Sequence, residues 1–150
     1  MHGNVYTTST ERFLSEKGVA TQANKTLPKN SICVSCIASV GLVCLTAEPS
    51  QTNQQINSII CKAGISPFYI YIKMTTLTEH LKQLGAGGST TLNVNKTLFG
   101  QIPILLPDEK TMDEFHQKVA PFFSTIRANQ YEIQHLDSLK SLLLLQLSSR

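Results

Sequence analysis

The chain has 150 residues, of which 41% are hydrophobic and 15% are charged, and its net charge at pH 7 is +3. This composition is too apolar for a disordered chain and too weakly charged for a long solvated coiled coil, and the length suits one hydrophobic core. No apolar stretch approaches a membrane span, and the polar residues 1–10 are unlike a signal peptide. We therefore expect a cytoplasmic protein without membrane contact.

The charge is divided unevenly along the chain. Residues 1–107 contain eight Lys or Arg and four Glu, which gives them a net charge of +4. Residues 108–150 contain five basic and six acidic residues, which gives them a net charge of −1. The mildly basic first part permits a nucleic-acid partner without requiring one.

Short strands are expected in the first half of the chain. Before them, Ser9 or Thr10 can cap a short helix that ends at Gly18, and a Leu-Pro-Lys-Asn turn follows at residues 27–30. Strands are predicted for three runs rich in β-branched and apolar side chains, at residues 31–37, 42–46 and 56–61.

The next part of the chain is a mixture of predicted elements. Residues 67–84 favour a helix, because their large apolar side chains recur about every four residues. A glycine-rich loop at 85–91 and a turn of helix at 95–99 follow it. Residues 101–106 predict a strand that Pro107 ends.

A long helical region is expected at the C-terminal end. Asp108 or Thr111 can cap its start, where the first turn is acidic. Pro121 either ends this helix, kinks it or begins the next one. Residues 122–147 contain neither Gly nor Pro.

The last helix carries a coiled-coil seam that Asn129 and Lys140 interrupt. Further leucines widen its apolar surface, so we expect the helix to pack against another long helix. The apolar seam residues lie seven, three, seven and four positions apart: Ile126, Ile133, Leu136, Leu143 and Leu147.

The four cysteines favour buried thiols over a zinc site. Cys33 and Cys36 form a C-x-x-C, but they lie in a strand-like run, where side chains three apart point to opposite faces. Cys44 and Cys61 lie singly in apolar runs of their own. We therefore expect reduced thiols and no metal.

No self-contained active site is recognisable in the sequence. The four His are scattered, and the motifs of zinc proteases, serine hydrolases, P-loop proteins and adenine methyltransferases are missing. The glycine run at 85–88 lacks the Lys of a phosphate-binding loop. We therefore expect neither catalysis nor a cofactor.

Side chains that suit DNA contact are common in the loops. Residues 50–57 are rich in Asn and Gln, whose amides can pair with adenine in a major groove. Residues 89–91 follow the glycine run and offer hydroxyl and N–H groups to phosphates. Each loop could also simply be solvated.

The order of these segments resembles the specificity subunit of type I restriction-modification enzymes. Residues 27–45 look like that family's leucine-proline turn, strand and small-x-Gly-x-Val hairpin, and residues 52–55 are similar to its Thr-Asn-Gln loop. Residues 88–91 and 101–107 look like the end of a target recognition domain. The tail, 129–145, resembles the family's conserved spacer helix.

This resemblance implies an α+β fold, with a small mixed sheet followed by a long coiled-coil-like helix. Residues 1–107 would form a target recognition domain, and residues 108–150 a helical spacer and dimerisation region. Because the family's opening Trp-containing strand is missing, the recognition domain would be truncated at its N-terminus. Family members carry two recognition domains and two helical regions, and this chain carries one of each.

The function implied by the resemblance is DNA recognition without catalysis. Such a subunit reads one half of a bipartite double-stranded DNA site and docks the modification and restriction subunits, which hold the S-adenosylmethionine and ATP sites. The alternative is a degenerate fragment that acts only as a helix-mediated protein-interaction module without DNA binding.

Two sets of residues are the candidates for these contacts. We expect a homodimer through antiparallel pairing of the helices at 122–147, which would imitate the twofold design of a complete subunit. The expected DNA-binding residues are Lys25, Lys29, Ser39, Thr52, Asn53, Gln54, Gln55, Lys73, Ser89, Thr90 and Thr91. The expected dimer or subunit interface is Phe122, Ile126, Ile133, Leu136, Leu139, Leu143 and Leu147.

Overall fold

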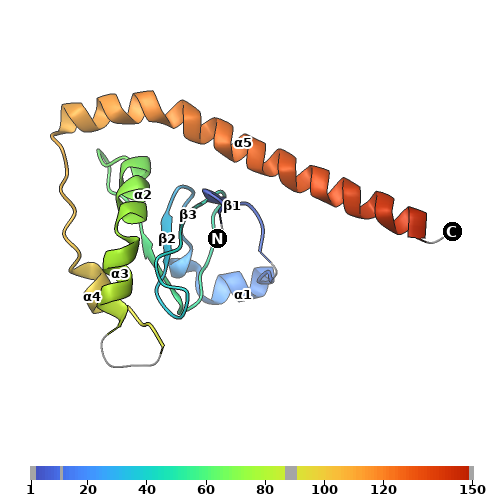
Figure 1. The fold of residues 1–150 in the computed structure, drawn as a ribbon, viewed down its shortest axis with the longest axis horizontal. Helices are drawn as coiled ribbons and strands as arrows, with labels where there is room; N and C mark the ends of the chain where they lie inside the picture. The colour runs from blue at the N-terminus through green and yellow to red at the C-terminus, as the bar shows by residue number, and fades with distance from the viewer. Residues whose placement is uncertain (1–2, 11, 87–90, 149–150) are drawn as a thin grey trace.

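A small mixed sheet carries helices beside it and one long helix across it, as Figure 1 shows. A computed structural model describes residues 3–10, 12–86 and 91–148. The strands are β1 (Tyr6–Thr7), β2 (Ile32–Ser35), β3 (Val43–Thr46) and β4 (Ile56–Ile59). The helices are α1 (Glu16–Thr21), the 3-10 turn η1 (Ala23–Lys25), α2 (Pro67–Thr76), α3 (Thr78–Gly85), α4 (Lys96–Gly100) and α5 (Glu109–Ser148).

The sheet has the strand order β1-β3-β2-β4. Strand β2 pairs antiparallel with β3 and with β4, whereas β1 runs parallel to β3. The predicted α+β class and the three predicted strands are therefore confirmed. The side chains of β2 and β3 are buried on both faces, as expected for short apolar strands covered on each side.

The hydrophobic core lies between this sheet and helix α2. Ile32, Val34 and Leu45 project from the sheet and are almost fully buried, as are Phe68 and Met74 from α2. The C-x-x-C is divided as predicted, because Cys36 joins this core whereas Cys33 faces Cys44 across β2 and β3 outside it. All four cysteines are free thiols.

The hairpin between β2 and β3 turns through Gly41, which has a φ of +91°. A Cβ at this position would lie 2.7 Å from Cγ2 of Thr78, whose hydroxyl donates a hydrogen bond to the Gly41 carbonyl. The turn therefore needs glycine both for its left-handed backbone and for the close approach of α3.

Gly41→Ala is expected to lower the free energy of unfolding by about 2 kcal/mol, because it adds backbone strain and a steric clash. Gly64→Ala is the matched control, since Gly64 also has a positive φ, of +80°, but open space around it. Chemical denaturation of both variants checks this. Equal losses at the two positions would contradict the role of the Thr78 contact.

The helix predicted near residue 10 begins later than expected. Helix α1 begins at Glu16 and not after Ser9 or Thr10, because the Ser15 hydroxyl accepts a hydrogen bond from Gly18 N and caps the helix there. Gly18 consequently lies inside α1 instead of ending it.

The helix predicted at 67–84 is interrupted. It breaks at Leu77 into α2 and α3. The hydroxyls of Thr75 and Thr76 donate to the carbonyls three residues before them, which competes with the regular helical pattern.

The strand predicted at 101–106 is also wrong. This segment is extended, but it forms no ladder with any strand in the described ranges. Pro103 and Pro107 remove backbone donors on which a ladder would depend. The segment instead packs Ile102 and Ile104 partly against the core, and the Leu105 carbonyl accepts a hydrogen bond from the Tyr69 hydroxyl.

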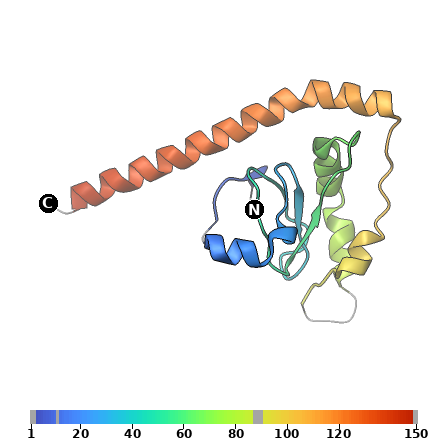
Figure 2. The ribbon, with the colours of Figure 1, turned by 180° about the vertical axis from the view of Figure 1, so that it is seen from behind.

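Helix α5 has 40 residues, about 60 Å at the usual rise per residue. Asp108 caps it by accepting hydrogen bonds from the N–H and hydroxyl of Thr111, which also lower the pKa of its carboxyl. The helix continues through Pro121, and both ribbon views show a bend in its first part (Figures 1 and 2). Its first part lies across the globule, whereas its C-terminal part projects beyond it (Figure 2).

Candidate nucleic-acid interface

Three segments meet at one end of the sheet, which we call the loop end: residues 36–42, residues 52–57, which include the start of β4, and residues 91–94. Backbone hydrogen bonds join them, because Cys36 N donates to Gln55 O at 2.8 Å and Ala38 N donates to Leu92 O at 3.0 Å. The Asn57 side chain adds a bond to Val94 O at 3.1 Å. The loops are therefore held as one surface and not as three independent segments.

Several predicted DNA-binding residues gather on this loop end. Their side chains are exposed, as contact with a nucleic acid requires. Asn53 has a structural task as well, because its Oδ1 accepts a hydrogen bond from Gln55 N and fixes the turn. The gathered residues are Ser39, Thr52, Asn53, Gln54, Gln55 and Thr91. Ser89 and Thr90 lie outside the described residues.

The predicted lysines do not gather there. Lys29 forms an ion pair with Glu48 at 3.7 Å, near the opposite end of β2 and β3. Lys73 lies over the Tyr69 ring, with 5.5 Å between the ammonium and the ring centroid. Lys25 is exposed at the end of η1. The segment around it is hydrogen-bonded to Gln51, the residue just before the 52–55 loop.

Gln51 and Asn57 are structural residues of this end that the sequence reasoning placed only within a polar loop. The Gln51 amide donates to the carbonyls of Val19 and Gln22 and to the Thr26 hydroxyl. These two side chains position the loops but leave the exposed Thr52–Gln55 side chains free to face outward. Nothing in the residue pattern distinguishes the side chains that position the loops from those that are exposed for contact.

Helix α5 is fixed to the globule by a cluster of aromatic rings around Phe123. The Phe123 ring stacks on Phe68, with 4.4 Å between centroids, and meets the edges of Tyr6 and Tyr71. Further up the helix, His116 stacks on Phe68, and its Nδ1 lies 2.9 Å from the Ser66 hydroxyl oxygen. Stacked and edge-on aromatic pairs add to the stabilisation from burial alone.

Gln130 extends this attachment to the edge strand β1. Its Oε1 accepts a hydrogen bond from Tyr6 N at 2.8 Å, and its Nε2 donates to Tyr6 O at 3.5 Å. The outer edge of β1 is therefore satisfied by the helix instead of by another strand. The Tyr131 hydroxyl donates to Glu48 close by.

Gln130→Ala is expected to lower the free energy of unfolding by about 1–3 kcal/mol, because Tyr6 is buried and its N–H would lose its partner. Gln117→Ala is the control, since Gln117 is exposed on the same helix. Hydrogen exchange of the Tyr6 amide, measured beside global unfolding, checks the cause. Unchanged exchange at Tyr6 in Gln130→Ala would contradict it.

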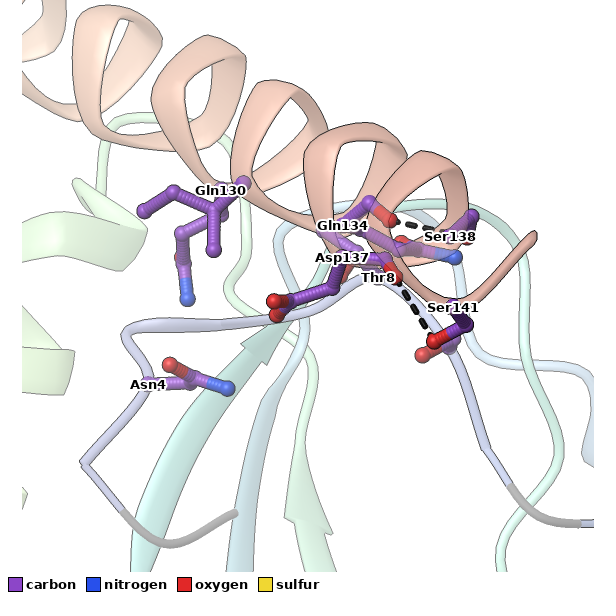
Figure 3. Close-up of a pocket in the computed structure, with 9 residues that line it drawn as sticks. Asn4, Thr8, Gln130, Gln134, Asp137, Ser138 and Ser141 are labelled. Atoms are coloured by element: carbon purple, nitrogen blue, oxygen red, sulfur yellow. Dashed lines mark hydrogen bonds between the residues drawn. The ribbon is translucent and has the colours of Figure 1, made fainter. Parts of the chain in front are cut away.

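A polar groove of about 450 Å³ lies where α5 leaves the globule. Figure 3 shows Asn4 and Thr8 of the N-terminal segment on one side and Gln134, Asp137 and Ser141 of the helix on the other. The Gln134 Oε1 is buried and has no hydrogen-bond partner among the described residues. The groove is open and carries no cluster of catalytic groups.

The predicted interface residues run from the attached part of α5 into its projecting part, and all of them except Ile126 are exposed. Phe122 has 69% of its surface exposed, although its neighbour Phe123 has only 6%. Ile126 is half-buried against the globule. The exposed members of the predicted interface are Phe122, Ile133, Leu136, Leu139, Leu143 and Leu147.

Two of the four cysteine thiols are held in their protonated form. Burial raises the pKa of Cys36 and of Cys61, so both thiols stay protonated at neutral pH. Nowhere in the described ranges do three His, Cys, Asp or Glu side chains come together as a metal-ligand set. None of the described helices could cross a bilayer.

The chain matches a known protein family along most of its length. The family described as "Type I restriction modification DNA specificity domain" matches residues 2–142. Because the match covers nearly the whole chain, the protein belongs to this family, as its segment order had suggested.

Two curated proteins are similar to this chain in sequence, and both are specificity subunits. The chain is 42% identical over 146 residues to the "Type I restriction enzyme HindI specificity subunit" of Haemophilus influenzae, which covers 96% of this chain and 32% of that protein. It is 31% identical over 122 residues to the "Type I restriction enzyme MjaIX specificity subunit" of Methanocaldococcus jannaschii, which covers 80% of this chain and 27% of that protein. The chain thus spans about a third or less of each relative.

Proposed function

We propose that the chain is a DNA sequence-recognition component of a type I restriction-modification system, and that its loop end reads one half of a bipartite site. The observation that carries this proposal is the family match over residues 2–142. The exposed amide and hydroxyl side chains of the loop end suit base edges and phosphates. The proposed contacts at the loop end are Ser39, Thr52, Asn53, Gln54, Gln55 and Thr91. Lys25, Lys29 and Lys73 are proposed as further DNA contacts away from the loop end, and Ser89 and Thr90, which lie outside the described residues, remain proposed contacts as well.

The two parts of the chain have different tasks in this proposal. Residues 1–107 form the recognition domain, and residues 108–150 form the spacer that sets its distance and angle to a second recognition domain. The Phe123 cluster supports the idea, since it fixes the helix to the domain without a flexible joint. The chain works in the cytoplasm, where the DNA is, and performs no chemistry of its own.

The exposed helix face is the proposed interface for protein partners. A helix that leaves this many leucines in water gains stability by covering them. Two copies of this chain would pair through the interface residues of α5 and present two recognition domains. The modification and restriction subunits would dock on the same helical region.

Salt-dependent DNA retention tests the recognition role. A protein that contacts about four phosphates loses about a hundredfold in affinity between 50 and 200 mM salt. We expect a dependence of this order for the chain on double-stranded DNA, measured by fluorescence anisotropy. Gln54→Ala is a better variant than Asn53→Ala for testing the loop end. The Asn53 side chain also fixes a turn, whereas Gln54 does not, so a change at Gln54 leaves the loop structure intact. Absence of any retention at 50 mM salt, with or without a modification subunit, would overturn the proposal.

A further inference from the structure

The exposed face of α5 carries two polar residues inside an apolar stripe, which we call the seam. Its eight positions lie alternately four and three residues apart, as in a coiled coil. The seam consists of Phe122, Ile126, Asn129, Ile133, Leu136, Lys140, Leu143 and Leu147.

Apart from Ile126, which packs partly against the globule, the seam lies on a different face of the helix from the one that packs on the globule. The face held by the globule has residues seven, four and seven positions apart: Met112 and Phe123 are buried, Val119 packs against the core, and Gln130 bonds to Tyr6. Phe122 is exposed directly beside the buried Phe123. A partner helix can therefore cover the seam while α5 keeps its own attachment.

The two polar residues occupy matching places from the two ends of the seam. Asn129 is the third position from the start, and Lys140 is the third from the end. When two such seams run antiparallel with their ends aligned, every apolar residue meets an apolar residue. The pairs are Phe122 with Leu147, Ile126 with Leu143, Asn129 with Lys140, and Ile133 with Leu136.

We propose that Asn129 and Lys140 set the direction and the register of the helix pair, the occupant of the seam being a second copy of this chain. The proposal rests on the dimer proposed above. Each Lys140 ammonium would donate a hydrogen bond to the amide oxygen of the partner's Asn129, and the contact would occur twice. A polar pair at core positions is a known way of fixing register at a cost in stability.

The competing arrangements are disfavoured by charge and by unsatisfied polar groups. In a parallel pair, Lys140 would face Lys140 of the second copy, and like charges would meet in the seam. In an antiparallel pair shifted by one heptad, Lys140 would face Leu136 or Phe122 and its ammonium would lose its partner. The ion pair of Lys140 with Asp137, at 3.9 Å and exposed, is too weak to cancel this charge.

Charge exchange between the two positions tests the register. Asn129→Lys places two ammonium groups face to face twice in the aligned antiparallel dimer, so we expect its dissociation constant to rise on the order of tenfold or more. Asn129→Lys combined with Lys140→Asp restores opposite charges in that dimer, so its affinity should return to the wild-type value or better. Sedimentation equilibrium over a wide concentration range measures the dissociation constants of the wild type and of both variants.

The controls separate this inference from the dimer itself. Ala128→Lys adds the same charge on an exposed neighbouring position outside the seam and should leave the dissociation constant nearly unchanged. A wild-type dimer whose double variant stays weak would overturn the register while leaving the dimer intact, since a parallel pair gives that result. A wild-type chain that is monomeric throughout would overturn both the dimer and the register proposed for it.

Discussion

Phe123→Ala is expected to lower the free energy of unfolding by about 3–5 kcal/mol. The ring is buried, stacks on Phe68 and contacts the edges of Tyr6 and Tyr71, so its removal leaves a cavity where α5, α2 and the sheet meet. Urea unfolding at protein concentrations below the dimer dissociation constant measures the effect on the monomer.

Phe122→Ala is the matched control for this variant. The same residue type stands one position earlier on the same helix but is 69% exposed. We expect the free energy of unfolding of the monomer to stay within about 0.5 kcal/mol of the wild-type value. Similar losses in the two variants would show that the aromatic cluster does not hold α5 on the globule.

Leu136→Asp is expected to raise the dissociation constant of the proposed dimer by about a hundredfold or more, because it places a charge near the centre of a closing apolar seam. Leu136 is 58% exposed in the single chain and contributes little to its core. The monomer should therefore remain folded. Sedimentation equilibrium gives the affinity, and far-ultraviolet circular dichroism confirms the folded state.

Leu145→Asp controls for the added charge. Leu145 is similarly exposed and lies on the same helix, but outside the seam. Its replacement should change the dissociation constant by much less than Leu136→Asp does. If the two variants weakened association equally, the leucines would act as a general apolar surface and not as a directed seam.

The sequence reveals the main elements of this fold, because their patterns are local. The strands follow from short β-branched and apolar runs, and the long helix from its periodicity and from the Asp108 cap. The predictions that are wrong concern segments where side chains compete with the backbone hydrogen bonds or where the described part of the chain offers no neighbouring strand to pair with. The break at Leu77 reflects threonine hydroxyls that bond back to the helix, and the segment at 101–106 has the residues of a strand without a neighbour to pair with.

The candidate site was only partly accessible to sequence reasoning. The polar loops were recognisable, but their assembly into one loop end depends on backbone contacts between residues more than thirty positions apart, such as Ala38 with Leu92. The sequence pattern does not by itself show that Phe123 is buried against the globule while Phe122 is exposed. A second periodic stripe through Met112, Val119 and Phe123 could have indicated the buried face. Gln130 gave no signal, since its role requires the edge of β1.

The most direct test of DNA recognition is selection from a random pool of double-stranded DNA, using the chain co-expressed with the modification subunit of its own genome. Sequencing the retained DNA measures the enrichment. We expect one short sequence to dominate, and Gln54→Ala to change or relax the preference at individual positions of it. Retention of an unenriched pool, or no retention at 50 mM salt by a complex that has formed, would contradict a role in sequence recognition.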